Sequence, residues 1–217
     1  MSKRIKDTYQ KHLWAFIAIN ILIFWSIFVY GTIDFDKIKL NLCEFASPKS
    51  LVFILSPIIT LVLNGIMSNS VKETIVFWKI KNRLPGCRAF SHFAMRDPRI
   101  NIESLKNKIR EFPKEPDEQN RVWYSLYQQY ENDEVVRGSH RDFLLTRDLT
   151  SLSFLFLVIF GSISIFYANS VVSMYLIYLI IQYLILSFSS RNYGNRFVCN
   201  VLAKASEDKW QLTNHPT

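Results

Sequence analysis

The stretch LWAFIAINILIFWSIFVY, at residues 13–30, decides the fold of this chain, because none of its side chains carries a charge. Three similar blocks follow, at residues 51–67, 152–167 and 171–188. An α-helix needs roughly 20 apolar residues to cross the ~30 Å hydrocarbon core of a bilayer. The blocks are apolar on all sides, whereas the strands of a membrane β-barrel alternate apolar and polar residues. The sequence therefore predicts four transmembrane helices.

The composition favours a membrane protein over a water-soluble one. Hydrophobic residues make up 49% of the chain and charged residues 20%, and the charged residues are almost wholly excluded from the four blocks. A soluble amphipathic helix instead carries charged residues opposite its apolar stripe. A cleaved signal peptide is the alternative for the first block. That block is longer than the roughly 7–15 apolar residues of a signal peptide, and no small-residue cleavage site follows it. We expect the first helix to be retained.

The distribution of basic residues predicts the orientation. Residues 1–12 carry a net charge of +3, residues 31–50 none, residues 68–150 +3, and the residues from 189 onward +2. Basic residues near helix ends stay in the cytoplasm. Both termini and the segment between the second and third helices are therefore expected to be cytoplasmic, and the loop 31–50 periplasmic. This arrangement predicts a multi-pass protein of the bacterial inner (plasma) membrane.

The predicted fold class is an all-α integral membrane protein with a helical cytoplasmic insert between the second and third transmembrane helices. A cytoplasmic N-terminus precedes the first pair of transmembrane helices, and a cytoplasmic tail follows the second pair. In chain order the predicted segments are 1–12, 13–67, 68–149, 150–188 and 189–217.

The insert reads as a series of helices that begin and end at identifiable residues. The second membrane helix is expected to continue through residues 71–81, until Pro85 and Gly86 end it. Asn101 is suited to cap a short helix that runs to Phe112.

Two longer helices follow in the second half of the insert. Residues 117–132 form a helix with an apolar stripe of helical period: Val122, Trp123, Leu126, Tyr127 and Tyr130. Asp133 is suited to cap a last helix that starts at Glu134 and continues into the third membrane block.

The chain contains no recognisable catalytic or metal-binding motif. The phosphate-binding patterns GxxxxGK[ST] and GxGxxG are absent, as are HExxH and GxSxG. Cys87, His92 and His140 lack the paired spacing of zinc ligands. An Arg-His ribonuclease pair is a further alternative, but the arginines lie too close in sequence to these histidines to favour it. We therefore expect no catalytic residue, no metal, no cofactor and no small-molecule substrate.

The membrane blocks contain no Asp, Glu, Lys, Arg or His, which argues against a proton- or ion-coupled carrier. Asn and Gln in lipid usually hydrogen-bond a neighbouring helix, and small residues allow close helix approach. Homo-oligomers are expected on this basis. The candidates for helix association or for lining a pore are Asn20, Asn64, Gly161, Ser162 and Gln182.

Aromatic and basic residues of the insert are candidates for sensing a partner: Trp123, Tyr127, Tyr130, Arg137, Arg141 and Arg147. The aromatic stripe could stack on nucleic-acid bases. More often, such a stripe is the packed core of a small helical bundle. The Arg-Asp repeat in HRDFLLTRD (140–148) predicts ion pairs next to the membrane.

The insert contains PGCRAFS (85–91), DPRI (97–100), EQNRVWYSLY (118–127) and HRDFLLTRD (140–148), between two pairs of membrane helices. This arrangement resembles the transmembrane effector that accompanies a retron reverse transcriptase in bacterial anti-phage defence.

The resemblance implies an effector that its reverse transcriptase, with RNA-linked single-stranded DNA, keeps silent. When infection disturbs that complex, the effector disrupts the inner membrane, and the infected cell stops growing before phage mature (abortive infection). Membrane lipids, further copies of the chain and the reverse transcriptase complex are the partners that it implies.

Two other functions fit the same sequence. The chain could be a non-enzymatic membrane anchor or scaffold whose insert holds a soluble partner. It could also be a membrane enzyme acting on lipid or nucleic acid through the region of His92 and His140.

Overall fold

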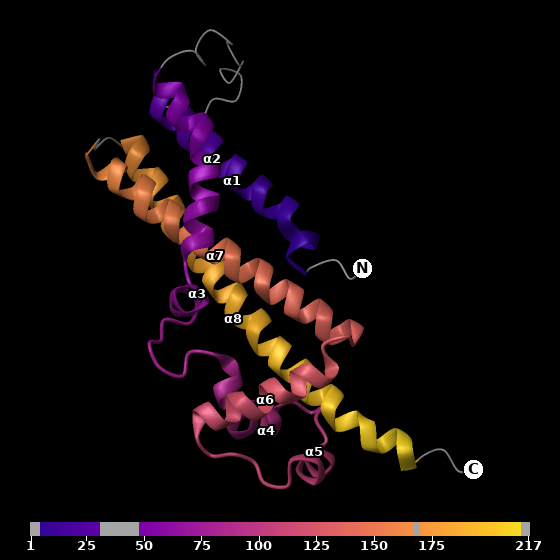
Figure 1. The fold of residues 1–217 in the computed structure, drawn as a ribbon. Helices are drawn as coiled ribbons and strands as arrows, with labels where there is room; N and C mark the ends of the chain where they lie inside the picture. The colour runs from indigo at the N-terminus through magenta and orange to yellow at the C-terminus, as the bar shows by residue number, and fades with distance from the viewer. Residues whose placement is uncertain (1–4, 31–47, 167–169, 214–217) are drawn as a thin grey trace. The chain divides into compact units, whose positions relative to one another are not determined.

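The computed structural model describes residues 5–30, 48–166 and 170–213 of the chain (Figure 1). Every regular element in these residues is a helix, in agreement with the predicted all-α class. In chain order the elements are α1 (Ile5–Tyr30), α2 (Pro48–Ile66), α3 (Asn69–Phe77), the 3₁₀-helix η2 (Pro85–Arg88), the π-helix η3 (Ala89–Phe93), α4 (Ala94–Arg96), α5 (Ile102–Ile109), α6 (Pro116–Tyr130), α7 (Glu134–Phe166) and α8 (Ser170–Thr213).

Among these residues, three helices are long and apolar enough to span a membrane. Their apolar spans are Asp7–Ile27 in α1, Glu134–Ser162 in α7 and Val172–Glu207 in α8. α2 contains a shorter apolar helix, Pro57–Ile66, in the block that the sequence predicts as the second crossing. Most of the predicted loop 31–50 lies outside the described residues.

The chain divides into two compact units. Unit 1 comprises Met1–Ile75 and Arg147–Ser187, and unit 2 comprises Val76–Thr146 and Phe188–Thr217. The boundaries fall within helices, so that α7 and α8 each contribute residues to both units.

In unit 1, α1 and α7 run in the same direction. Near the start of α1, the Tyr9 hydroxyl donates a hydrogen bond to Asp148 Oδ2 in α7 at 3.2 Å. Further along both helices, the rings of Phe24 and Phe160 stack with their centroids 4.1 Å apart. The contacts advance together along the two sequences, and the two helices are therefore parallel.

α8 runs in the opposite direction within unit 1. Its Tyr175 ring lies 5.8 Å from the ring of Phe24, centroid to centroid. About two turns later, the Tyr183 hydroxyl donates a hydrogen bond to the Ile75 carbonyl at 2.8 Å. Ile75 lies within one turn of Lys72, whose ammonium contacts the same carboxylate as the start of α1. The start of α1 and the Tyr183 end of α8 therefore lie at one end of unit 1.

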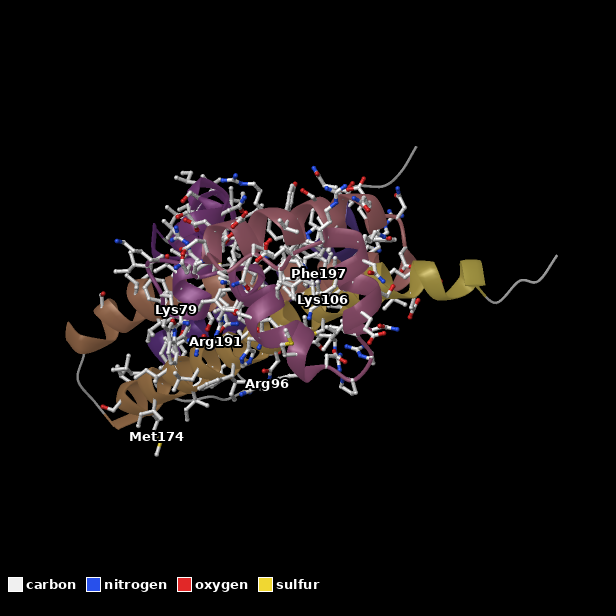
Figure 2. The ribbon with its side chains drawn as sticks, turned by 90° about the horizontal axis from the view of Figure 1, so that it is seen from below. Lys79, Arg96, Lys106, Met174, Arg191 and Phe197 are labelled. Atoms are coloured by element: carbon white, nitrogen blue, oxygen red, sulfur yellow. The ribbon has the colours of Figure 1, made fainter. Side chains whose placement is uncertain are left out.

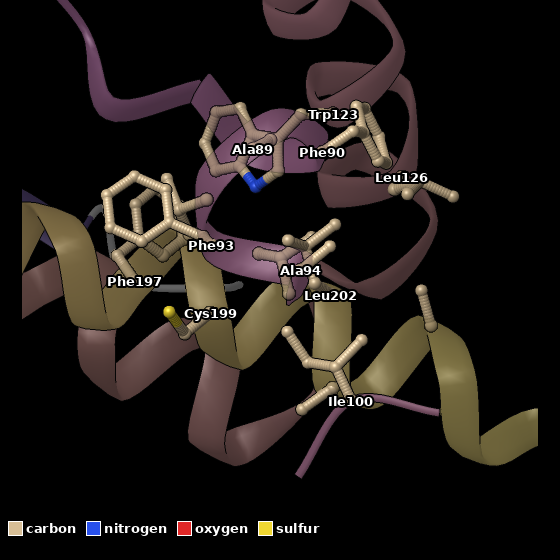
Figure 3. Close-up of a cluster of buried hydrophobic side chains, with 14 of the residues drawn as sticks. Ala89, Phe90, Phe93, Ala94, Ile100, Trp123, Leu126, Phe197, Cys199 and Leu202 are labelled. Atoms are coloured by element: carbon tan, nitrogen blue, oxygen red, sulfur yellow. The ribbon is translucent and has the colours of Figure 1, made fainter. Parts of the chain in front are cut away.

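Unit 2 is built around one hydrophobic core that both the insert and α8 supply. Phe90, Trp123 and Leu126 come from the insert, and Phe197 and Leu202 come from α8 (Figure 3). Full burial of each large apolar side chain contributes roughly 1.5–3 kcal/mol. The insert therefore depends on α8 for its core.

The segment predicted as a tail, residues 189–217, is mostly the continuation of α8 to Thr213. Val198 and Val201 of this segment are fully buried. The sequence predicts no element in this segment, because its apolar residues are interleaved with Arg, Lys and Asn rather than gathered in a block.

The aromatic stripe predicted for residues 117–132 lies on α6, as expected. Trp123 and Leu126 are buried, and Val122, Tyr127 and Tyr130 pack against the same core. The stripe is therefore part of the hydrophobic core of unit 2.

The predicted caps of α5 and α7 are confirmed. Asn101 Oδ1 accepts a hydrogen bond from the Ser104 amide at 3.0 Å, and Asp133 Oδ1 accepts from the Val135 amide at 3.0 Å. α5 ends at Ile109 rather than at Phe112. The reason is Arg110, whose φ of 68° takes the backbone out of the helical region.

The prediction that the second membrane helix continues through residues 71–81 is wrong. α2 ends at Ile66 and a separate helix, α3, covers Asn69–Phe77. Ser68 begins α3, since its Oγ accepts a hydrogen bond from the Val71 amide at 3.3 Å. Trp78 ends it, because its φ of 54° is incompatible with a right-handed helix.

The buried side chain of Gln119 fixes η3 against α6. Its Oε1 accepts hydrogen bonds from the amides of Phe90 and Ser91, at 3.2 and 3.1 Å, and its Nε2 donates to the Lys114 carbonyl at 3.1 Å. Buried polar groups have to be hydrogen-bonded in this way, since an unpaired one costs about 1–3 kcal/mol.

Asp97 and Arg99 connect the turn before α5 to α8. Arg99 donates from Nε to Asp97 Oδ1 at 3.0 Å and from Nη2 to Oδ2 at 2.7 Å. Its Nη1 also donates to Asn200 Oδ1 in α8 at 3.0 Å. The hydrogen bond from Arg99 is the largest cause that lowers the pKa of Asp97, to about 2, while partial burial acts in the opposite direction.

We expect the interaction of Asp97 with Arg99 to make the stability of the protein depend on pH. Its pKa in the folded protein lies below the ordinary value of 3.8, so its contribution is present above about pH 4 and is lost as the pH falls toward 2. In thermal unfolding of the detergent-solubilised protein, Asp97→Asn should lower the Tm by about 2–4 °C at pH 7 and by less at pH 3. Asp142→Asn, in a more exposed ion pair, is the control. A Tm difference for Asp97→Asn that does not change with pH would contradict this assignment.

A candidate latch in unit 1

Four polar side chains meet in the interior of unit 1, and we name them the Asp148 cluster: Tyr9, Lys72, Arg147 and Asp148. Lys72 Nζ lies 3.2 Å from Asp148 Oδ1, and Arg147 Nη2 lies 3.4 Å from the same oxygen. Tyr9 donates to the other oxygen. The side chains of Lys72 and Asp148 are only 6% and 3% exposed. The carboxylate is therefore shielded from water and surrounded by donors.

The members of the cluster come from three helices that are distant in sequence. Tyr9 lies in α1, Lys72 in α3, and Arg147 and Asp148 in α7. Positions four residues apart share one face of a helix. Leu13 and Leu152, each four residues after a cluster member on α1 or α7, are almost completely buried. Packing of these faces is what takes the polar groups out of water.

Because of the energetics of this burial, the cluster determines how α1, α3 and α7 are arranged. At about 4 Å and an effective dielectric constant of about 20, two unit charges attract by ~4 kcal/mol. Removing both charges from water costs a similar amount, so a buried pair adds little net stability. Breaking such a pair, however, typically costs about 3–5 kcal/mol. The cluster therefore favours one packing of α1, α3 and α7 over alternatives in which Asp148 loses its donors.

The Asp148 cluster is suited to holding helices in place rather than to acting on a substrate. Both oxygens of Asp148 accept hydrogen bonds, from cations on one side and from a phenol on the other. Because both oxygens are engaged and the side chain is only 3% exposed, the carboxylate is not open to a substrate. The arrangement is suited to act as a latch, by which we mean a contact that holds three helices in one arrangement.

The two asparagines predicted for the membrane helices are both buried in unit 1. Asn20 Nδ2 donates to the Phe16 carbonyl, one turn earlier in α1, at 2.9 Å. The Oδ1 atoms of Asn20 and Asn64 are buried and accept no hydrogen bond from the residues that the structure describes. Polar atoms in this state favour any rearrangement that supplies a donor.

The other predicted membrane residues differ in their exposure. Gly161 is buried, and a Cβ atom there would lie 3.2 Å from Leu176 Cδ1 of α8, so the close approach that it allows is between two helices of one chain. Ser162 is exposed. Gln182 Nε2 donates to the Tyr178 hydroxyl at 3.2 Å. Of the small candidates, Ser162 is thus the one that a second copy could contact directly.

The residues predicted to sense a partner fall into different surroundings. The Trp123 ring packs edge-on against Phe197 at 5.3 Å, and the Tyr127 hydroxyl lies 3.0 Å from His140 Nδ1. Tyr130 contacts Lys108. The aromatic stripe is thus engaged in the core rather than presented for stacking.

The arginines of the same set are distributed along α7. Arg137 and Arg141 are exposed, and Arg141 pairs with Asp142 at 3.0 Å. Arg147 belongs to the Asp148 cluster instead. Both predicted Arg-Asp ion pairs of the segment 140–148 are therefore present, one on the surface and one buried.

The two histidines of the membrane-enzyme hypothesis occupy separate aromatic surroundings. The His140 ring stacks on Phe197 with centroids 4.8 Å apart, and the His92 ring lies edge-on to Phe93 at 5.0 Å. Desolvation, followed by the charges of Arg96 and Arg88, lowers the pKa of His92. This favours a neutral imidazole on His92 near pH 7.

No set of three or more His, Cys, Asp and Glu side chains in the described part of the chain is placed to hold a metal ion. Cys87 and Cys199 are free thiols in the core of unit 2. Burial is the largest cause that raises the pKa of the Cys87 thiol, which disfavours the reactive thiolate. Cys43 lies outside the described residues.

Sequence reasoning missed Tyr9 and Lys72. Each stands within a few residues of an apolar block and beside other polar residues. The one feature of the sequence that marks these two residues is their place on the helix. Each lies on the helix face that carries the apolar side chains of the next turn. Which carboxylate they share could not be read from a single sequence.

Substitution of Lys72 should test the latch. Lys72→Met keeps the length of the side chain but removes one of the cations from a buried carboxylate, and we expect it to lower the free energy of unfolding by about 2–4 kcal/mol. The measurement is thermal unfolding of the full chain in detergent. Lys11→Met, at an exposed position of α1, should cost less than about 0.5 kcal/mol.

A double variant separates the ion pair from simple packing. Lys72→Met combined with Asp148→Leu removes both charges of this pair and leaves the less buried Arg147 cation. The double variant should recover part of the loss, because an apolar replacement of a buried pair is often neutral. If the double variant is as unstable as the sum of its single changes, the charge interaction is not what holds these helices.

Comparison of the chain with protein-family models, with curated proteins and with solved structures finds no match.

Proposed function

We propose that the chain crosses the inner membrane four times, with both termini and unit 2 in the cytoplasm. The directions of the helices in unit 1 support this, because α1 and α7 are parallel while α8 is antiparallel to both. With α2 as the second crossing, an alternating bundle results. The excess of basic residues in segments 1–12 and 68–150 and in the tail gives the orientation.

Labelling of Cys43 tests this topology in the unmodified chain. Cys87 and Cys199 are buried, so a membrane-impermeant maleimide added to spheroplasts should label the protein through Cys43 in the loop 31–50. Cys43→Ser should abolish the labelling. Labelling that appears only after the membrane is permeabilised would instead place this loop in the cytoplasm.

We propose that the protein is a membrane effector of retron-type anti-phage defence, which disrupts the inner membrane when its partner releases it. The observation that carries this proposal is the continuity of α7 and α8, each of which runs through both units without a break. A signal received by unit 2 then reaches the membrane helices along two covalent helical connections.

The Asp148 cluster supplies an element with two states. Arg147 and Asp148 are the first residues that α7 contributes to unit 1. A displacement of α7 that separates Asp148 from Lys72 and Tyr9 breaks the latch and frees α1 and α3. Because breaking a buried pair costs about 3–5 kcal/mol, the silent state persists until release of the partner changes the preferred position of α7.

Association of copies in the membrane follows from the released state. The buried Oδ1 atoms of Asn20 and Asn64 have no donor among the described residues, and interhelical hydrogen bonds from Asn in membranes contribute about 0.6–2 kcal/mol each. Ser162, exposed on α7, is a further contact of this kind. An oligomer held by these groups is the proposed lesion.

The restraining partner follows from the resemblance of the insert's motifs. A reverse transcriptase with its RNA-linked single-stranded DNA would bind unit 2, and the exposed Arg137 and Arg141 are the candidate contacts for its phosphates. The aromatic stripe of α6 contributes indirectly, because it supports the surface that carries these arginines.

Membrane potential after expression of the chain alone is the measurement that tests the function. We expect depolarisation of growing bacteria within minutes of induction, followed by growth arrest. Asn64→Leu should reduce the depolarisation at least about tenfold, since it removes a hydrogen bond worth up to ~2 kcal/mol. Lys11→Gln, at an exposed position of the same unit, is the matched control and should not change it.

The alternative, a passive anchor for a soluble partner, predicts a different outcome. Unchanged membrane potential and normal growth, with as much protein in the membrane as a toxic control, would contradict the effector and support the anchor. Equal toxicity of the parent chain and Asn64→Leu would reject the role of Asn64 while leaving the effector in place.

A further inference from the structure

The segment WKIKNR, at residues 78–83, exposes apolar and basic side chains together. Trp78 is 49% exposed and Ile80 is 81% exposed. Lys79 and Lys81 are also exposed. Large apolar side chains at such exposure, flanked by cations, are typical of segments that meet a membrane surface.

The backbone of this segment is held in an unusual conformation. Trp78 has a φ of 54° and Asn82 a φ of 48°. A bulky residue with positive φ is an outlier that costs about 1–3 kcal/mol and persists only where surrounding contacts impose it. The direction of the Trp78 side chain is therefore fixed by other groups.

Arg191 and Phe188 of α8 are these groups. The Arg191 guanidinium lies 3.8 Å from the centroid of the Trp78 ring, and its Nε donates to the Val76 carbonyl at 2.6 Å. The Phe188 ring packs edge-on against Trp78 at 5.8 Å. Figure 2 labels Arg191, which belongs to α8, and Lys79.

The position of Phe188 shows where Trp78 lies along α8, relative to the apolar block 171–188. Phe188 is the last residue of the apolar block 171–188 and is 53% exposed. Because Trp78 contacts it directly, the indole lies where the apolar part of α8 ends and the polar part begins. Trp and Tyr are enriched at this level of a membrane–water interface, and Lys and Arg act as further anchors there.

We propose that residues 78–83, together with Phe188 and Arg191, form a binding site for the headgroup of an anionic phospholipid. The ammonium groups of Lys79 and Lys81 would contact the negatively charged headgroup, and Trp78, Ile80 and Phe188 would lie against the upper acyl chain. Charge complementarity selects an anionic lipid over a zwitterionic one. This inference is independent of the effector function and requires only that the apolar part of α8 lies in a membrane.

Removal of two charges should weaken binding of the anionic lipid specifically. The full chain in neutral detergent is titrated with phosphatidylglycerol or with phosphatidylcholine, and bound lipid is counted by native mass spectrometry. Each basic residue near an anionic surface contributes enough that Lys79→Gln combined with Lys81→Gln should lower the affinity for phosphatidylglycerol by about 30-fold. The affinity for phosphatidylcholine should not change.

Two further variants make the result specific. Lys114→Gln combined with Arg121→Gln removes the same charge from exposed positions elsewhere in unit 2, and should change the affinity by less than about twofold if the site is local. Lys79→Arg combined with Lys81→Arg keeps the charge and should retain binding.

Three outcomes would overturn the proposal. Equal losses for the two glutamine variants would show that overall charge, rather than this site, attracts the lipid. No loss for the variant at Lys79 and Lys81 would remove these residues from any lipid contact. The same variants are also titrated with a single-stranded DNA oligonucleotide. If the glutamine variant at Lys79 and Lys81 loses binding of this DNA while its binding of phosphatidylglycerol is unchanged, the segment is assigned to nucleic acid instead.

Discussion

The buried carboxylate of Asp148 is the constraint on which unit 1 depends. A charge this far from water requires cations and hydrogen-bond donors, and these come from Tyr9 in α1, Lys72 in α3 and the adjacent Arg147. The three helices must therefore meet at one place and in one register. The parallel course of α1 and α7 and the return of α8 are consistent with that single meeting point.

Much of the fold could be predicted from the sequence, because its signals are local. Apolar blocks of membrane length mark α1, α7 and α8, and they need no partner to be recognised. Asn101 and Asp133 identify helix starts by hydrogen bonds to amides only two or three residues away. The apolar stripe of α6 identifies its buried face by period alone.

The rest depends on contacts between residues distant in sequence. The end of α3 at Trp78 follows from a backbone conformation that Arg191, more than one hundred residues later, stabilises. The role of α8 in the core of unit 2 was missed because Phe197 and Leu202 stand among polar residues and show no block. Within the candidate site, the sequence predicts a role for Arg147 but not for Tyr9 or Lys72, since nothing local marks a shared carboxylate.

The shared use of α8 also sets the order in which the protein can be completed on the ribosome. The insert is synthesised before the residues of α8, yet its core contains Phe197, Val198 and Leu202. Neither compact unit can therefore close until the chain has grown past residue 188, and unit 2 must wait for roughly another 15 residues. At about 5–20 residues per second, the insert spends several seconds with Trp123 and Phe90 uncovered. During that interval it is a natural substrate for chaperones, and an early binding partner could shield the same surface.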